Sequence, residues 1–210
     1  SHYPEALKSY EEALRIAREI GDKRGEGDNL GRLGTVYQIL GQNEESLKSY
    51  EGALGIAKNI GDKRSEGIHL GNLGNVYQSM GLNEEALKFH EEALRIAREI
   101  GYKSAEGDHL GNIGVIYRGL GQNEESLKSY EEALGIAREI GDKGGEGRHL
   151  GNLGNVYQEL GMYEEALKYI QQALKISREV GNKIVEGINL GNLGDIFLSL
   201  NRLEESKTHL

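Results

Sequence analysis

One unit of constant length repeats along the whole chain. The segment YEEALRIAREIGDK begins at Tyr10, and close copies begin at Tyr50, His90, Tyr130 and Ile170, so the period does not drift. A constant period of this size is typical of a stacked array in which each unit contacts mainly its neighbours. The sequence therefore predicts a repeat architecture.

Each unit contains two segments with helical patterning. One runs from about Glu66 to Met80 in the second unit, carries the letters LGNLGN, and is stopped by Gly81; we name it helix A. The segment after it, helix B, is expected to begin at the N-cap Asn83 and to end before the C′ glycine Gly101. Its apolar stripe has near-helical spacing and consists of Leu87, Ala93, Leu94, Ala97 and Ile100. The unit is therefore expected to be an antiparallel helical hairpin.

The period also divides the chain. We expect an orphan helix B of a preceding unit at 1–22, complete units at 23–62, 63–102, 103–142 and 143–182, and a helix A with part of a fifth helix B at 183–210. The last helix A is expected over about 185–200, followed by the stub Leu203–Leu210. Because such arrays normally carry polar terminal caps, we expect a single solenoid domain that is a fragment of a longer array.

The spacing of key residues resembles the tetratricopeptide-repeat (TPR) signature, L-x-x-L-G-x-x-Y, then Gly, then E-E-[AS]-L, then Ala and Leu. In the second unit these residues are Leu70, Leu73, Gly74, Tyr77, Gly81, Ala86, Ala93 and Leu94. The resemblance implies an all-α fold, an α-solenoid that is a right-handed superhelix of antiparallel helix hairpins. The usual unit has 34 residues, and the six extra residues here are expected to lengthen helix B and its loop, IGDKRGEG in the first unit. The longer unit and the tandem Leu-Gly-Asn resemble the TPR array of the Pins/LGN family of polarity adaptors.

Two glycines recur in every helix A. The second is expected to let the small residues of helix B approach closely, and the set is Gly34, Gly74, Gly114, Gly154 and Gly194. The first is expected to face the concave groove of the superhelix as a bare floor for another chain, with helix packing as the alternative; this set is Gly31, Gly71, Gly111, Gly151 and Gly191. A chaperone-type carboxylate clamp is not expected, because it would need lysine where the chain has these first glycines.

Amide and charged side chains share the groove face of helix A. Asparagine and glutamine both donate and accept hydrogen bonds, so a ladder of them suits an extended peptide backbone, while Arg118, Arg148 and Glu159 would set its register. The candidate partner-binding residues are Asn72, Asn75, Gln78, Asn112, Arg118, Arg148, Asn152, Asn155, Gln158 and Asn192. The alternative is that they are solvated helix residues. The Pins/LGN resemblance implies that asparagines and basic residues of helix A hold extended partner segments, but only Arg148 keeps that family's arginine after GEG.

Several kinds of chemistry are not expected. The chain has no cysteine and a net charge of −9, which argues against a thiol site and against nucleic-acid or anionic-membrane surfaces. It shows neither a signal peptide nor an apolar run long enough to span a membrane, which with the missing cysteines favours a cytoplasmic location. His69, His109 and His149 recur once per unit, too far apart to share a metal, and are expected to form helix-flank hydrogen bonds. We therefore predict no catalytic residues, cofactor, metal or enzyme activity, and no membrane insertion.

The function that the sequence favours is an adaptor or scaffold that binds an extended segment of a partner protein in the concave groove. One alternative is a structural spacer or scaffold whose copies stack end to end. A third possibility is a sensor or docking region of a larger regulator.

Overall fold

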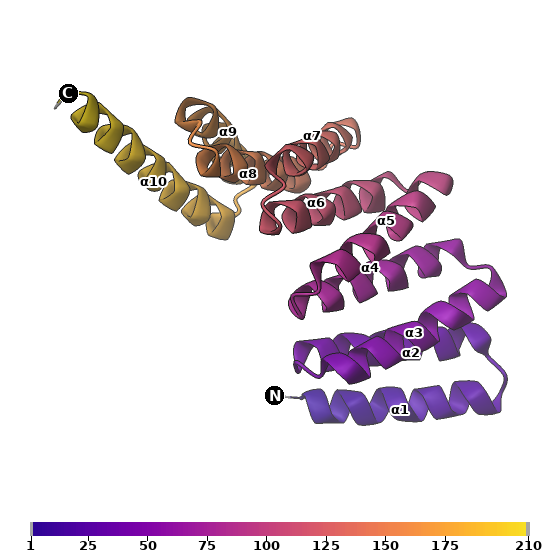
Figure 1. The fold of residues 1–210 in the computed structure, drawn as a ribbon. Helices are drawn as coiled ribbons and strands as arrows, with labels where there is room; N and C mark the ends of the chain where they lie inside the picture. Colours follow the sequence, from indigo (N-terminus) through magenta and orange to yellow (C-terminus); the bar gives the residue numbers. More distant parts are fainter. Residues whose placement is uncertain (1, 209–210) are drawn as a thin grey trace. The chain divides into compact units, whose positions relative to one another are not determined.

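The structure is a computed structural model, which describes the backbone of residues 2–208 and the side chains of residues 2–201. The described residues form ten α-helices and no strand (Figure 1). The helices are α1 Tyr3–Glu19, α2 Lys23–Ile39, α3 Asn43–Ile60, α4 Lys63–Ser79, α5 Asn83–Glu99, α6 Lys103–Gly119, α7 Asn123–Glu139, α8 Lys143–Glu159, α9 Tyr163–Glu179 and α10 Lys183–Thr208. The predicted all-α fold is confirmed.

The helices belong to two compact units, residues 1–102 with α1–α5 and residues 103–210 with α6–α10. In the first, α2 packs on α3 and α4 on α5 as hairpins, and α1 and α3 pack on the helix A that follows each of them. In the second, α6 packs on α7 and α8 on α9, while α7 contacts α8 and α9 contacts α10. Each of these two compact parts of the chain is thus a stack of helical hairpins, as predicted for an α-solenoid.

A left-handed glycine ends each helix from α1 to α9. At the end of α5, for example, the Gly101 N–H donates to the Arg98 carbonyl (3.2 Å) and the Tyr102 N–H to the Ala97 carbonyl (2.8 Å). These bonds satisfy carbonyls that the helix leaves open, and they require a positive φ at the glycine. The glycines with positive φ are Gly21, Gly41, Gly61, Gly81, Gly101, Gly121, Gly141, Gly161 and Gly181. The predicted stops at Gly81 and Gly101 are confirmed.

Helix A begins earlier than the sequence suggested. α4 starts at Lys63, because Asp62 is its N-cap and accepts a hydrogen bond from the Ser65 N–H (3.1 Å). Asp142 caps α8 in the same way, accepting from the Gly145 N–H at 2.9 Å. The expected loop IGDKRGEG is therefore wrong, because most of it is the first turn of helix A. The expected N-cap Asn83 is also wrong, since the N-cap of α5 is Leu82, without a side-chain capping bond.

The first turn of helix A is fixed by a glutamate that the sequence analysis did not single out. In α8 this is Glu146, which is buried. Lys143 Nζ donates to its Oε2 (2.7 Å), and Arg138 Nε, from the preceding helix B, donates to its Oε1 (2.8 Å). These hydrogen bonds, from Lys143 first and then Arg138, lower the pKa of Glu146. The GEG sequence thus joins helix B to the next helix A.

The last helix also differs from the expectation. α10 runs without a break from Lys183 to Thr208 instead of ending near residue 200 before the start of another helix. Asn201 occupies the position at which Gly41, Gly81, Gly121 and Gly161 end the earlier A helices. Without a glycine at this left-handed position, the helix continues. The end of the expected stub, residues 209–210, lies outside the described residues.

The second glycine of the LGNLGN copy is a packing position in the four complete repeats, as predicted. A Cβ atom added to Gly114 would lie 2.8 Å from Tyr130 Cε1 of helix B, and one added to Gly34 would lie 2.9 Å from the Tyr50 ring. The small residue one turn earlier approaches too, since Ser126 Oγ donates to the Gly114 carbonyl at 2.8 Å. Both tyrosine rings are fully buried. Gly194 is different, because no described atom lies within 4 Å of its added Cβ.

At Gly31, Gly111 and Gly151 the first glycine is not the open floor that we expected, whereas no described atom lies within 4 Å of a Cβ added to Gly191. A Cβ on Gly31 would lie 2.8 Å from His69 Cε1, and a Cβ on Gly111 would lie 2.8 Å from His149 Cε1. At Gly151 the covering atom is Oδ1 of Asn189, at 3.3 Å. In each case the side chain comes from the next helix A. These three glycines therefore allow neighbouring A helices to stack, which was the packing alternative.

Candidate functional site

The predicted partner-binding residues fall on one face of the A helices in both compact units. In the first, Asn72, Asn75 and Gln78 lie half-buried on α4. In the second, they are distributed over three helices: Asn112 and Arg118 on α6, Arg148, Asn152, Asn155 and Gln158 on α8, and Asn192 on α10. All are half-buried except the exposed Arg148.

Polar pairs link the A helices of residues 103–210. Asn192 Nδ2 donates to Asn155 Oδ1 (2.7 Å), which connects α10 to α8. Arg118 Nε lies 3.7 Å from Glu159 Oε1. Arg148 Nη1 lies 3.5 Å from Asp108 Oδ1, so the arginine that the Pins/LGN comparison singled out already has an acidic neighbour on α6.

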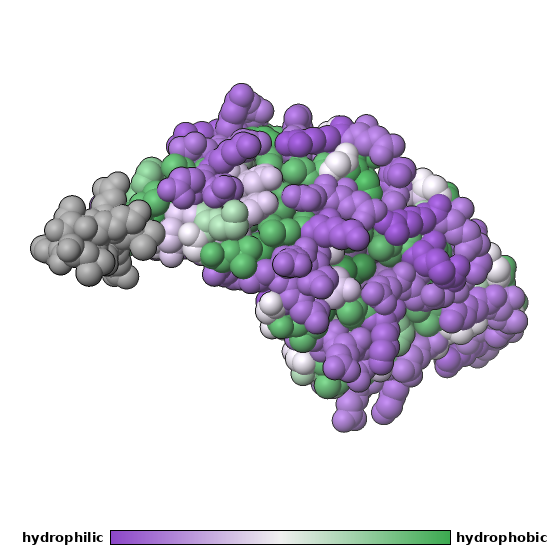
Figure 2. All heavy atoms as spheres, turned by 45° about the horizontal axis from the view of Figure 1, so that its top comes forward, coloured by the Kyte–Doolittle hydropathy of each residue, from purple (hydrophilic) through white to green (hydrophobic). Residues whose placement is uncertain are grey.

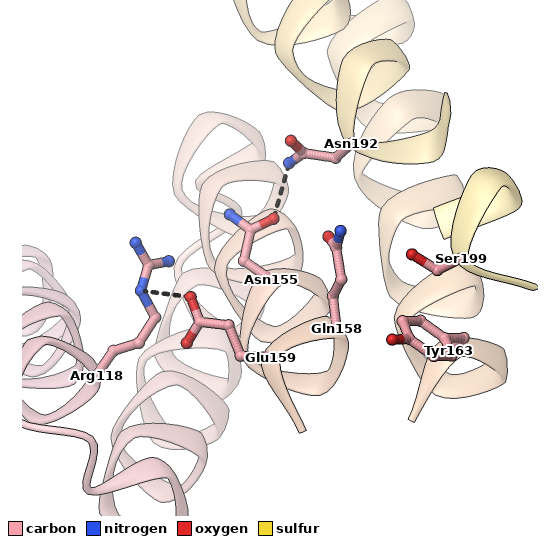
Figure 3. Close-up of a pocket in the computed structure, with 7 residues that line it drawn as sticks. All are labelled: Arg118, Asn155, Gln158, Glu159, Tyr163, Asn192 and Ser199. Carbon is pink, nitrogen blue, oxygen red and sulfur yellow. Dashed lines mark hydrogen bonds and ion pairs between the residues drawn. The ribbon is translucent and has the colours of Figure 1, made fainter. Parts of the chain in front are cut away.

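An open pocket of about 390 Å³ lies among these helices, as Figure 3 shows. Its lining residues are Arg118, Asn155, Gln158, Glu159, Tyr163, Asn192 and Ser199. Four of them, Arg118, Asn155, Gln158 and Asn192, were predicted as partner-binding residues, and Glu159 was predicted to set register. Tyr163 was not predicted, because it comes from the start of α9 outside the A-helix face, and Ser199 was not predicted although it lies one repeat after Glu159. Asn112, Arg148 and Asn152 do not line the pocket.

The pocket offers donors and acceptors close together. In Figure 3 the side chains of Arg118 and Glu159 point toward one another, and the amides of Asn155, Gln158 and Asn192 lie beside them. Among the described contacts, no hydrogen bond engages the Gln158 amide or the Tyr163 hydroxyl. The site can therefore form several hydrogen bonds to a ligand that both donates and accepts.

The recurring histidines lie behind this face and do not form part of it. His149 is 2% exposed, and its Nδ1 finds no hydrogen-bond partner among the described residues; the same holds for His69 Nδ1. The predicted helix-flank hydrogen bond is therefore not made by either Nδ1 atom. Burial, helped by the nearby Arg148, lowers the pKa of His149 to about 4, although Asp142 acts in the opposite direction. Burial likewise lowers the pKa of His69. Both histidines pack on glycines of the preceding helix A.

Two other features of the described residues bear on function. No group of three or more His, Cys, Asp and Glu side chains in this part of the chain could hold a metal ion. No helix within it combines the length and the apolar character that crossing a membrane requires. Figure 2 shows hydrophilic side chains over most of the visible face, with smaller apolar areas between them.

Several solved structures share the fold. BtubC (BKLC) from P. vanneervenii is 19% identical, with a TM-score of 0.85 over 99% of this chain and 88% of that one. A STAND signal-transduction ATPase with a tetratricopeptide-repeat sensor, from Pyrococcus horikoshii, is 23% identical, with a TM-score of 0.79 over 90% of this chain and 30% of that one. A Rap protein complexed with competence and sporulation factor is 18% identical, with a TM-score of 0.76 over 93% of this chain and 58% of that one. At these identities the similarity shows the fold alone.

A search of curated proteins gives no match, and none of the comparisons supports the Pins/LGN subclass that the Leu-Gly-Asn repeats suggested. The tetratricopeptide-repeat family, in contrast, matches overlapping segments at residues 2–59, 26–99, 64–139, 105–179 and 145–210. These segments span almost the whole chain, and the hairpin stack agrees with them. The chain belongs to the tetratricopeptide-repeat family.

Proposed function

We propose that the chain is a non-catalytic protein-interaction module that holds an extended segment of a partner on the A-helix face of residues 103–210. The observation that carries this proposal is the polar pocket, to which three A helices contribute side chains. The repeat family supports the general role, since its hairpin stacks serve as scaffolds for protein–protein interaction.

The chemistry of the face fits a peptide main chain. An extended segment presents N–H and C=O groups in alternation, and the amides of Asn155, Gln158 and Asn192 can pair with either kind. Neighbouring helices pack about 8–10 Å apart, so a segment that crosses α6, α8 and α10 spans roughly 16–20 Å. At about 3.3 Å per residue, this corresponds to five or six residues.

The Rap protein offers a parallel on the same fold. It is described in complex with competence and sporulation factor. Its identity to this chain is 18%, so the parallel supports the kind of function but identifies no ligand.

The experiment uses a phage-displayed library of random linear dodecapeptides, selected on the 210-residue protein. Selected peptides are then measured against the double variant Asn152→Ala/Asn155→Ala. We expect binding to weaken about tenfold, which matches the loss of one or two hydrogen bonds of about 1 kcal/mol each. The matched control is Asn72→Ala/Asn75→Ala, which changes the same repeat positions on α4.

The control should bind like the unchanged protein, and both variants should keep the same helical circular dichroism. The proposal is overturned if the α8 double variant binds the selected peptides with full affinity. Equal losses in both variants would also count against it, because the site would then not be confined to residues 103–210.

A further inference from the structure

The pocket gathers residues that depart from the chain's own repeat. The three other complete units carry glutamine at the position of Arg118, namely Gln38, Gln78 and Gln158. At the position of Glu159 the other complete units carry Ile39, Ser79 and Gly119, and at the position of Tyr163 their B helices begin with Asn43, Asn83 and Asn123, although α1 begins with Tyr3. Two separate departures, Arg118 on α6 and Glu159 on α8, therefore line one pocket together with Tyr163 of α9.

The charged pair of this pocket is not closed by a direct hydrogen bond. Arg118 Nε and Glu159 Oε1 are 3.7 Å apart, which is longer than a hydrogen bond. The two side chains are 31% and 49% exposed, and Figure 3 shows them pointing toward one another at one side of the pocket. A ligand group can therefore accept from the guanidinium and donate to the carboxylate at the same time.

This pair discriminates among ligand side chains by charge. A carboxylate attracted by Arg118 is repelled by Glu159, and an ammonium attracted by Glu159 is repelled by Arg118. A primary carboxamide carries no net charge, and its C=O and NH₂ groups lie side by side on one plane. Its two ends match the guanidinium donor and the carboxylate acceptor. The neighbouring amides of Asn155 and Gln158 suit the same kind of group.

We propose that this pocket recognises the primary carboxamide of an asparagine or glutamine side chain in the bound segment, and so fixes the register of that segment. The inference rests on the proposed function, which supplies the segment. The pair of opposite charges provides the selectivity, and the equivalent positions of the other complete units do not carry it.

The test compares library selections on the unchanged protein and on variants that restore the repeat's own residues. Arg118→Gln introduces the residue of positions 38, 78 and 158, and Glu159→Ser introduces that of position 79, so both variants should fold. Peptides from the unchanged protein should share one fixed asparagine or glutamine. With Arg118→Gln the fixed position should change to lysine or arginine, and with Glu159→Ser to aspartate or glutamate.

Affinities give a second readout. Replacing the fixed asparagine or glutamine of a selected peptide by leucine should weaken binding to the unchanged protein about tenfold, but less than about twofold in the double variant Arg118→Gln/Glu159→Ser. The control Lys128→Gln removes one positive charge from the exposed surface of α7 and should leave both the selection and the affinities unchanged.

The outcomes separate the two proposals. If selected peptides depend on Asn152 and Asn155 but share no fixed carboxamide, the carboxamide inference is wrong while the binding function stands. The same conclusion follows if the double variant still requires the carboxamide. If no selected peptide depends on the α8 asparagines, the proposed function itself fails.

Discussion

At the scale of single residues, the effect of a glycine depends on what surrounds its missing side chain. Gly111 and Gly114 lie one helical turn apart on α6, and each is covered by a ring, His149 in one case and Tyr130 in the other. Gly135, in the interior of α7, is exposed with open space around the position of a Cβ. The first two allow helices to pack, whereas the third only lowers the helix propensity of its segment.

Replacement of these glycines by alanine should therefore have opposite effects. Gly135→Ala should raise the free energy of unfolding by about 0.5–1 kcal/mol, because alanine favours the helix and meets no neighbour. Gly114→Ala should lower it by about 1–3 kcal/mol, because the new methyl group overlaps the Tyr130 ring. Urea unfolding followed by circular dichroism measures both values. A destabilised Gly135→Ala protein would contradict this account.

The buried His149 predicts a dependence of stability on pH. Its pKa in the folded protein is about 4 and its unfolded value is about 6.5, so the unfolded chain binds a proton more readily. The contribution of the neutral His149 to the free energy of unfolding is therefore fully present above pH 6.5. It is lost as the pH falls from there toward 4, and the loss is about 2 kcal/mol near pH 5. The variant His149→Asn, which introduces the residue of positions 29 and 189, should lose less stability between pH 7.5 and 5. Identical losses in the two proteins would rule out this role.

The side chains that pack on the glycines could be predicted from the sequence only in part. The recurrence of the glycines was visible in the repeat, and so was the packing role of Gly34 and Gly114, because helix B follows at once in the chain. The packing of side chains on Gly31 and Gly111 could not be predicted from the sequence, because His69 and His149 come from the next repeat. The angle of a residue on its own helix does not reveal how close the neighbouring helix lies.

At the scale of the helix, the start of α8 depends on two side chains. Asp142 caps α8 by accepting a hydrogen bond from the Gly145 N–H. Glu146 accepts one hydrogen bond from Lys143, in the same turn, and another from Arg138, on the preceding helix α7. For the equivalent segment of the first unit, IGDKRGEG, we expected a loop that holds part of the six extra residues. The helix forms nevertheless, because the cap and the ion pairs of the buried Glu146 outweigh the low helix propensity of Gly144, Gly145 and Gly147.

Removal of the capping side chain should cost more stability than removal of an asparagine at the start of another helix. Asp142→Ala should lower the free energy of unfolding by about 1 kcal/mol, because the Gly145 N–H loses its acceptor. Asn123→Ala, at the first residue of α7, should change it by less than about 0.5 kcal/mol, because the Asn123 Oδ1 has no partner among the described residues. Thermal or urea unfolding of the two variants tests the difference, and equal losses would refute the assignment of the cap.

At the scale of the whole molecule, α10 presents an unusual concentration of exposed apolar side chains. Ile184 is 78% exposed, Ile188 and Leu198 are each 57% exposed, and Phe197 is 48% exposed. Beside them, Gly194 has open space where the equivalent Gly114 is covered by a tyrosine ring. Exposed apolar areas of this kind favour association, while the net charge of −9 opposes it.

We therefore expect the 210-residue chain to self-associate weakly, and more strongly in high salt, which screens the like charges. Sedimentation velocity should show an average mass that rises with protein concentration. The double variant Ile188→Glu/Leu198→Glu should remain monomeric over the same series. A single monomeric species for the unchanged chain at every concentration and salt level would contradict the prediction.

The pocket was predicted only in part. Arg118, Asn155, Gln158 and Asn192 share the face of helix A, so helical periodicity was enough to group them. Tyr163 begins α9, and Ser199 lies in the part of α10 that was expected to end near residue 200. Ser199 lies one repeat after Glu159 and so follows the period of the face. Tyr163 lies outside that face, so only the three-dimensional packing shows that it borders the same space.

The contact between a histidine and the glycine of the helix A before it has a consequence for the length of the chain. His69 covers Gly31, His149 covers Gly111, and Asn189 covers Gly151, so at these three junctions one repeat supplies the glycine and the next repeat supplies the covering side chain. A block of one repeat length thus carries the covering side chain for the repeat before it and the glycine for the repeat after it. Duplication or deletion of a whole block leaves every junction complete, whereas a change of any other length leaves one unmatched. Related arrays are therefore expected to differ in length by whole repeats.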